Sequence, residues 1–394
     1  MLWSKGENLN IFAQGIRQRI LLVAGTRPEC LKLASLVRAL RARDDLDTLL
    51  MNSGQHVAMV ARSFAQLGLT PDMAAPQCSA HSLSATLSLL RAGIRDAART
   101  AQATLLVSQG DTSTAYATAL AARDLGLPLA HVEAGLRTDH PLRPFPEEYF
   151  RRAIGKLACV HFAPTALAEN NLLAEGVDAL SIHRVGNTAI DVLREVVTNP
   201  DTSALPRLPP TRRLITLTLH RRENYGRGLD TVCKAVLRLL EVEPDAGVVC
   251  PVHPNPIVGA RIRRHLSDHP RIVLTEPLDY RPFIALLARS ALAITDSGGI
   301  QEEAPYLGTP ILVARENTER PETLELGFAS LAPMHVPGIV SAARALLAAP
   351  RPQAIAFDAR APYGDGHAGT RIAATLATFL ENSNATPSIG SVAA

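Results

Sequence analysis

Short apolar runs alternate with longer segments of helical spacing along almost the whole chain, and this alternation limits the possible folds more than any other feature. Six runs lie in the first half and five in the second, at residues 20–24, 48–51, 104–107, 129–132, 159–162, 182–185, 214–219, 247–250, 271–274, 291–295 and 310–313. Wholly apolar strands must be covered on both faces, and strands joined through helices run parallel. The sequence therefore predicts an α/β fold built on parallel sheets.

The length of 394 residues exceeds what one hydrophobic core usually supports, so two domains are expected. The best boundary is the segment 198–211, which holds four prolines and can form neither a helix nor an inner strand. We expect an N-terminal domain over residues 18–197 and a C-terminal domain over residues 211–360. A final helix at 367–382 lies beyond the last predicted strand and is expected to pack back on the first domain.

Charge and composition argue against several classes of function. The net charge of +3 is too small for nucleic acid or a membrane surface to be the main partner. No apolar run approaches the roughly 18 residues that a membrane-spanning helix needs, and the apolar stretch near the N-terminus is too short for a signal peptide. The five cysteines are scattered and form no CxxC motif, which favours reduced thiols in a cytoplasmic protein.

Open parallel sheets bind ligands at the carboxyl ends of their strands, so the residues that follow each apolar run are the candidates. The first run ends in GTRPE at 25–29, where Pro28 suits the first position of a helix. A helix N-terminus beside Arg27 attracts anions, and Lys32 lies one turn further on. An ordinary strand-to-helix turn with a surface arginine explains this motif equally well.

Two acidic residues follow neighbouring predicted strands, Asp111 after the third run and Glu133 after the fourth. Side chains at these positions are expected to point into the same crevice. The structural alternative is that Asp111 caps the next helix and that Glu133 pairs with Arg137. Capping fits Asp111 better than Glu133, because Glu133 lies between a strand and a glycine and has no obvious helix to cap.

The segment PFPEE at 144–148 is followed one turn later by Arg151. Prolines followed by acidic residues are typical of a helix N-terminus, and this structural interpretation is strong for Glu148. Glu147 remains a candidate catalytic acid.

The second half carries two histidines and one glycine-rich turn at its predicted strand ends. His220 follows the run at 214–219 and precedes two arginines and two glycines, whereas His253 lies in a proline-rich loop after the next strand. The sharpest feature is TDSGGIQEE at 295–303, a strand end followed by small residues and a helix. Helix amides and Ser297 suit a diphosphate, and Glu303 suits ribose hydroxyls.

Three common cofactor motifs are missing from the sequence. It contains no GxxxxGK[ST] segment, no GxGxxG segment and no histidine and cysteine cluster with zinc-ligand spacing. We therefore expect neither a P-loop NTPase nor a nicotinamide cofactor nor a metal ion.

Taken together, the motifs closely resemble those of the non-hydrolysing UDP-N-acetylglucosamine 2-epimerases, from residue 25 to about residue 372. They are GTRPE at 25–29, GD at 110–111, HVEAGLRT at 131–138, FPEE at 145–148, HRREN at 220–224, VHPNP at 252–256, TDSGGIQEEAP at 295–305, ERPE at 319–322 and PYGDG at 362–366. The resemblance implies two Rossmann-like domains with parallel sheets facing a central cleft, the glycosyltransferase-B type, and a homodimer. It also implies C2 epimerisation of UDP-N-acetylglucosamine by loss and re-addition of UDP.

The resemblance also implies roles for individual residues. Positions that match UDP-binding residues of the family are Arg27, Lys32, His253, Ser297, Gly298, Gly299, Glu303 and Arg320. Positions that match residues of the catalytic cleft are Asp111, Glu133, Glu147, Arg151 and His220. The sequence leaves open which acid acts on which face of C2.

The chain departs from the family pattern at three places. Arg143 stands where most relatives have serine, and Phe150 stands before Arg151 where they have asparagine. Residues 76–82 read PQCSAHS where many members carry a QPGQ-type segment that binds an activating UDP-N-acetylglucosamine. We expect weak or absent activation, unless other side chains rebuild that pocket around Gln55 and His56. Three other functions stay open: a hydrolysing or modified-UDP-sugar epimerase, a glycosyltransferase of the same fold, and a non-catalytic nucleotide-sugar sensor.

Overall fold

The computed structural model describes residues 18–138, 140–141, 144–199, 205, 208–209, 211–219 and 226–385. The chain divides into two compact units, one formed by Met1–Val192 with His367–Ala394 and the other by Leu193–Gly366. This division falls inside helix α7 (Thr188–Thr198), a few residues before position 197 and ahead of the proline-rich segment. The last turns of α7 belong to the second unit, in which Glu195 pairs with Arg281 at 2.8 Å and Arg194 donates to the Asp365 carbonyl at 3.2 Å.

The first unit contains a seven-stranded parallel sheet with the order β3-β2-β1-β4-β5-β6-β7. The strands are β1 (Arg19–Ala24), β2 (Asp47–Asn52), β3 (Met73–Ala74), β4 (Leu105–Gln109), β5 (Leu129–Val132), β6 (Val160–Ala163) and β7 (Ile182–Arg184). The order reverses at β1, which pairs with β2 on one side and with β4 on the other. A crevice at the carboxyl ends of the strands is expected at such a reversal.

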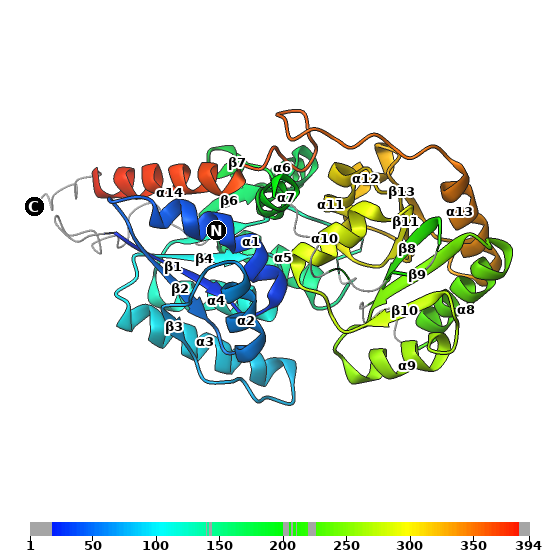
Figure 1. Cartoon of the computed structure of the whole chain (residues 1–394). Coiled ribbons are helices and arrows are strands. Elements are labelled where there is room, and N and C mark those ends of the chain that lie inside the picture. The colour runs from blue at the N-terminus through cyan, green and yellow to red at the C-terminus, as the bar shows by residue number, and fades with distance from the viewer. Residues whose placement is uncertain are drawn as a thin grey trace, which may run out of the picture. The chain divides into compact units, whose positions relative to one another are not determined.

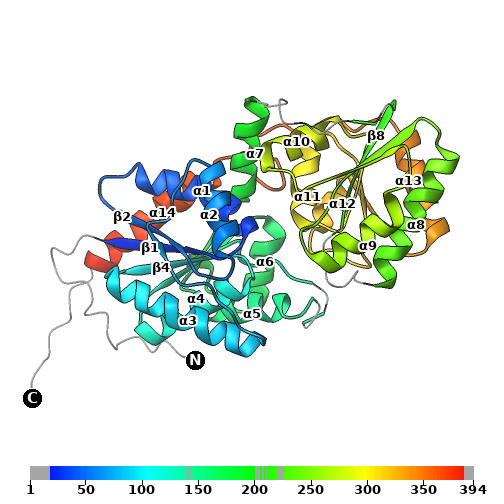
Figure 2. The same ribbon diagram turned by 60° about the horizontal axis from the view of Figure 1, so that its bottom comes forward.

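Helices cover both faces of this sheet. They are α1 (Arg27–Arg41), α2 (Val57–Gln66), α3 (Leu83–Thr100), α4 (Ser113–Leu125), α5 (Glu147–Leu157), α6 (Ala166–Ala174), α7 and α14 (Ala368–Ala385), with a 3-10 turn at Ala179–Ser181. Figures 1 and 2 show α1, α2 and α14 on one face and α3, α4 and α5 on the other.

The C-terminal helix α14 packs against α1 in the first unit (Figure 1). Its first turn is held by Asp191, which accepts from the amides of Ala368 at 2.9 Å and Gly369 at 2.7 Å. Gly369 permits the close approach of the two helices, because a Cβ there would lie 2.7 Å from the carbonyl carbon of Ser35. The helix is therefore fixed to the first unit at its N-terminus.

The second unit contains a six-stranded parallel sheet with the order β10-β9-β8-β11-β12-β13. The strands are β8 (Arg213–Thr218), β9 (Ala246–Pro251), β10 (Ile272–Thr275), β11 (Leu292–Thr295), β12 (Ile311–Val313) and β13 (Ala329–Leu331). The helices are α8 (Arg227–Val242), α9 (Pro256–Leu266), α10 (Tyr280–Arg289), α11 (Gly298–Glu303), α12 (Pro321–Glu325) and α13 (Val336–Ala348), with a 3-10 turn at Ala304–Leu307.

The eleven apolar runs are all strands, which confirms the predicted α/β class with parallel sheets. Most of their aliphatic side chains are buried, and Leu21, Val107, Leu217 and Val248 have no exposed surface. Two edge strands lie outside the predicted runs: β3 has only two residues, and Ser330 interrupts the short apolar stretch of β13. Among the described residues, no helix combines the length and apolar character that crossing a membrane requires.

Candidate active site

The turn after β1 is packed tightly against the turn after β4. A Cβ on Gly25 would lie 2.0 Å from Thr114 Oγ1 and 2.4 Å from Ser53 Oγ, so only glycine fits. The buried Glu29 accepts from the Gly25 amide at 2.9 Å and from Thr112 Oγ1 at 2.6 Å. Burial raises the pKa of Glu29 to about 7, against the opposite effect of these hydrogen bonds. This acid links the two strand-end turns, a role that the sequence analysis did not identify.

Glu133 directly follows β5 and has a backbone φ of +66°. A residue with a Cβ pays roughly 1–2 kcal/mol for this left-handed conformation, so the surroundings must hold it there. The Glu133 carboxylate accepts from Lys32 Nζ and from Gln109 Nε2. Pairing with Arg137 was the structural alternative for Glu133, and it is wrong: Arg137 instead bonds to Glu175 at 2.7 and 2.8 Å.

Asp111 follows β4 and faces Arg151 of α5. Arg151 Nη1 donates to Asp111 Oδ2 at 2.7 Å, and the aspartate side chain is about one third exposed (31%) whereas the arginine is buried. Asp111 does not cap α4, because Thr112 is the N-cap residue and accepts from the Ala115 amide at 3.0 Å. The structural reading of Asp111 as a helix cap is therefore wrong.

Glu147 is the first residue of α5, one turn before Arg151, and is partly exposed. Arg143, in the loop before it, lies outside the described residues. Arg27 begins α1 and is partly exposed, beside the tight turn at Gly25. In the first unit the structure thus forms two ion pairs between predicted site residues, Lys32 with Glu133 and Arg151 with Asp111.

In the second unit, the glycine-rich turn after β11 packs against the guanidinium of Arg320. A Cβ on Gly298 would lie 2.4 Å from Arg320 Nη1, which explains the glycine at this position. Arg320 is held in place by Glu302 at 2.7 Å and by Glu319 at 2.5 Å. Ser297 is the N-cap residue of α11, and Gly299 lies in its first turn. Ser297, Gly298 and Arg320 are therefore neighbours, as a phosphate-binding turn requires.

Glu303 ends α11, where Tyr280 Oη donates to its Oε1 at 2.9 Å. Burial and the nearby Glu303 charge raise the pKa of Tyr280 well above its usual value, so the phenol stays protonated and remains a donor. The sequence analysis did not identify Tyr280, because nothing in the pattern of α10 places its hydroxyl beside a carboxylate 23 residues further on.

His253 lies in the loop between β9 and α9. Its Nδ1 accepts from the Asn255 amide at 3.2 Å, which in the neutral ring leaves the proton on Nε2. His220 and the rest of the HRREN segment at 220–224 lie outside the described residues. The described part of the chain contains no group of three or more histidine, cysteine, aspartate or glutamate residues that suits a metal ion.

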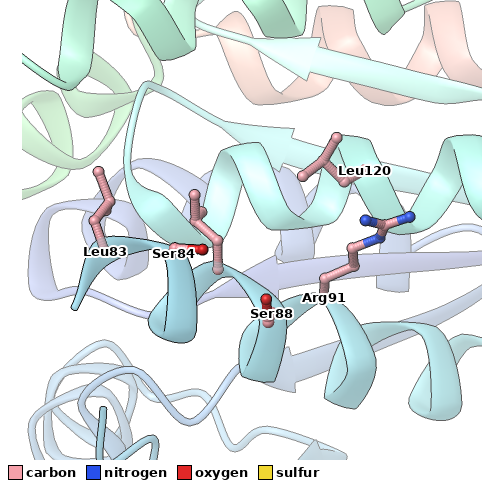
Figure 3. Close-up of a pocket in the computed structure, with 6 residues that line it drawn as sticks. Leu83, Ser84, Ser88, Arg91 and Leu120 are labelled. Atoms are coloured by element: carbon pink, nitrogen blue, oxygen red, sulfur yellow. The ribbon is translucent and has the colours of Figure 1, made fainter. Parts of the chain in front are cut away.

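A separate surface hollow of about 380 Å³ lies between α3 and α4 (Figure 3). It is lined by Leu83, Ser84, Leu87, Ser88, Arg91 and Leu120. None of these is a predicted site residue. The hollow is therefore distinct from the strand-end groups.

Comparison with known proteins places these groups in a family. The family model for UDP-N-acetylglucosamine 2-epimerase matches residues 38–377. A probable UDP-N-acetylglucosamine 2-epimerase of Ralstonia solanacearum is 38% identical over 92% of this chain and 100% of its own. The UDP-N-acetylglucosamine 2-epimerase of Bacillus subtilis is 39% identical over 91% of this chain and 94% of its own.

Solved structures agree with the sequence comparison. The UDP-GlcNAc 2-epimerase of Neisseria meningitidis, bound to UDP-GlcNAc, superimposes with a TM-score of 0.86 at 33% identity, over 92% of this chain and 100% of that one. The glycosyltransferase SnogD of Streptomyces nogalater matches at a TM-score of 0.54 and 19% identity, which shows the fold alone. The predicted glycosyltransferase-B type of fold is thus confirmed, and the chain belongs to the UDP-N-acetylglucosamine 2-epimerase family.

Proposed function

We propose that this protein is a non-hydrolysing isomerase that interconverts UDP-N-acetylglucosamine and UDP-N-acetylmannosamine through 2-acetamidoglucal. It needs no metal or nicotinamide cofactor and supplies a precursor of surface polysaccharide. The observation that carries the proposal is the pair of strand-end carboxylates, Asp111 and Glu133, each ion-paired with a cation. The five cysteines, none of them in a disulfide, support a cytoplasmic location.

The reaction needs both acids and cations. The C2 proton of the sugar is barely acidic until UDP leaves C1 and an oxocarbenium-like centre forms beside it. A carboxylate stabilises that centre and another accepts the proton, while cations and helix amides hold the departing diphosphate. Inversion requires the proton to return from the opposite face, so two differently placed acid/base groups are needed. Asp111, Glu133, Glu147 and His220 are the proposed set, with Arg151 holding Asp111 in place.

The proposed UDP-binding residues divide between the two units. In the second unit, the turn at Ser297, Gly298 and Gly299 with Arg320 suits the diphosphate, and Glu303 suits the ribose hydroxyls. His253 presents an Nε2–H donor. Arg27 and Lys32 in the first unit supply further positive charge. Lys32 pairs with Glu133, so the proposed phosphate-binding cation lies beside a proposed catalytic acid.

Product analysis separates this function from its alternatives. Proton NMR of UDP-N-acetylglucosamine incubated with the enzyme is expected to show UDP-N-acetylmannosamine at equilibrium with the substrate, with the UDP linkage intact. Free N-acetylmannosamine with an equal amount of UDP would indicate a hydrolysing enzyme. No change without an added acceptor would indicate a glycosyltransferase or a nucleotide-sugar sensor.

We expect activation by UDP-N-acetylglucosamine to be weak or absent. Gln77 bonds to the chain at Gln55 and Val57, and Gln55 Oε1 accepts from the Thr114 amide and hydroxyl, so both glutamine side chains are engaged within the protein. The measurement starts from pure UDP-N-acetylmannosamine, and an unregulated enzyme should turn it over at once with a hyperbolic rate curve. A long lag that a trace of UDP-N-acetylglucosamine abolishes would contradict this expectation and leave the epimerase assignment untouched.

We propose that the protein is a homodimer and that the face formed by α3 and α4 is part of the contact. This face carries the hollow of Figure 3, whose lining includes Leu83 and Leu87, and the Leu83 side chain is 37% exposed. Light scattering at micromolar concentration should give twice the chain mass. Leu83→Glu should shift the mass towards the monomer, whereas Leu180→Glu, at a leucine that is 87% exposed, should not. A monomeric wild-type protein would contradict the proposal.

A further inference from the structure

Glu148 is a fully buried carboxylate in the first turn of α5, with no exposed surface. An acidic residue that only complements a helix N-terminus lies in solvent, because the helix dipole stabilises it there without desolvation. Burial of a charge is costly unless it is paired and hydrogen-bonded. The contacts of Glu148 therefore show what it does.

Its two oxygens accept from three groups. Glu148 Oε2 accepts from Arg151 Nε at 3.0 Å and from the Thr138 amide at 3.3 Å, and Glu148 Oε1 accepts from Arg152 Nε at 2.9 Å. A carboxylate offers only acceptors, and every partner here is a donor. A carboxylate without a proton therefore matches these partners, because neither of its oxygens places a hydrogen opposite an N–H group.

The same guanidinium connects Glu148 to Asp111. Arg151 faces Glu148 through Nε and reaches Asp111 Oδ2 through Nη1 at 2.7 Å. The arginine side chain is only 3% exposed, and its planar fork presents the two groups of donors in fixed directions. Glu148 orients the Arg151 guanidinium, and this orientation in turn determines the position in which Arg151 holds Asp111.

A second branch reaches the segment that leads to Glu147. The Thr138 amide lies at one end of residues 138–147 and Glu148 directly follows the other end, so their hydrogen bond ties the two ends together. Arg152 continues the network to Glu175 at 2.8 Å, and Arg137 bonds to that same acid. The side branch thus connects Arg137 and Thr138 to α5.

We propose that Glu148 is a positioning residue for the epimerisation, one that fixes the Asp111 carboxylate through Arg151. The inference rests on the proposed function. Glu148 itself does not touch the sugar. It acts by holding a bridging guanidinium whose other end carries a reacting carboxylate, so its effect must pass through Arg151.

The substitution Glu148→Gln tests this directly, since it keeps the shape and turns one acceptor into an amide donor that faces the arginines. We expect kcat to fall about 10- to 100-fold, with KM and the Kd for UDP within about threefold of wild type. Glu175→Gln is the matched control. It makes the same chemical change in the same network but has no contact with Arg151, and it should keep wild-type kcat.

A double-mutant cycle distinguishes positioning from general destabilisation. Arg151→Lys keeps the charge but loses the fork, so adding Glu148→Gln to it should lower kcat by less than about twofold further. The inference would be overturned if the loss of kcat in the double variant equalled the product of the losses in the two single variants. A wild-type kcat for Glu148→Gln would also overturn it. If Glu148→Gln does not fold, Glu148→Asp takes its place in the cycle, with the same two outcomes.

Wild-type activity keeps this test separate from the proposed function. If the wild-type protein does not epimerise UDP-N-acetylglucosamine, the proposed function is wrong. If the wild-type protein is active and Glu148→Gln keeps the wild-type kcat, only the positioning role of Glu148 is wrong.

Discussion

Glu133→Gln is expected to lower turnover by about 10²- to 10⁴-fold, the range typical of losing a general acid or base. The Glu133 carboxylate accepts hydrogen bonds from Lys32 and Gln109. In Glu133→Gln, the NH2 group of the new side chain would lie opposite one of these donors. Shape and the left-handed backbone stay the same, which confines the change to charge and proton transfer. Initial rates of UDP-N-acetylmannosamine formation measure the effect, and calorimetry with UDP should show an affinity within a few-fold of wild type.

Asp111→Asn should give a loss of the same order, because it removes the charge that Arg151 holds at 2.7 Å. Glu169→Gln is a suitable control. It makes the same kind of change on α6, at an acid that pairs at 3.6 Å with the exposed Arg184, and it should be silent. If both Asp111→Asn and Glu133→Gln lost only thermal stability and kept kcat, the two acids would be structural and the proposed site would be wrong.

Glu303→Ala is expected to weaken UDP binding about 10- to 100-fold, the value of a hydrogen bond to a charged group. Because the proposed contact of Glu303 is to the ribose, wild type should prefer UDP over 2′-deoxy-UDP and Glu303→Ala should lose that preference. Ser297→Ala should weaken UDP binding alone, through loss of one donor to the diphosphate. Competition calorimetry with the two nucleotides gives the ratio directly.

Two further variants locate the effect of Glu303. Tyr280→Phe removes the hydroxyl that donates to Glu303 Oε1 at 2.9 Å, so it should weaken UDP binding less than Glu303→Ala. Glu325→Ala changes an exposed acid of α12 and should leave both affinities alone. A preference for UDP that survives in Glu303→Ala would show that another group reads the ribose.

The order and type of the elements could be predicted from the sequence because buried parallel strands leave an unambiguous apolar pattern. All eleven predicted strands are present, and the motifs after β1, β4 and β11 lie beside the points where the sheets reverse their order. β3 has only two residues and Ser330 interrupts the apolar stretch of β13, so neither strand leaves such a pattern. The division between the units depends on contacts of α7 with residues far along the chain, which local composition does not contain.

Parts of the candidate site could not be predicted, because they depend on contacts between distant residues. The left-handed conformation of Glu133 is stabilised by Lys32, 101 residues earlier. Glu148 fits a helix N-terminus by its position in the sequence, and only its burial and its three donors show another role. Thr112, rather than Asp111, caps α4, although both residues suit a cap by type.

Deuterium incorporation at C2 is the most direct test of the central claim. UDP-N-acetylglucosamine is incubated with the wild-type enzyme in D2O, and the sugar is followed by proton NMR and mass spectrometry. Removal of the C2 proton and its return from solvent predict one deuteron at C2 in UDP-N-acetylmannosamine and in the recovered substrate, with UDP still attached. A product that keeps its original C2 proton, or a substrate that shows no exchange, would contradict the mechanism proposed for this protein.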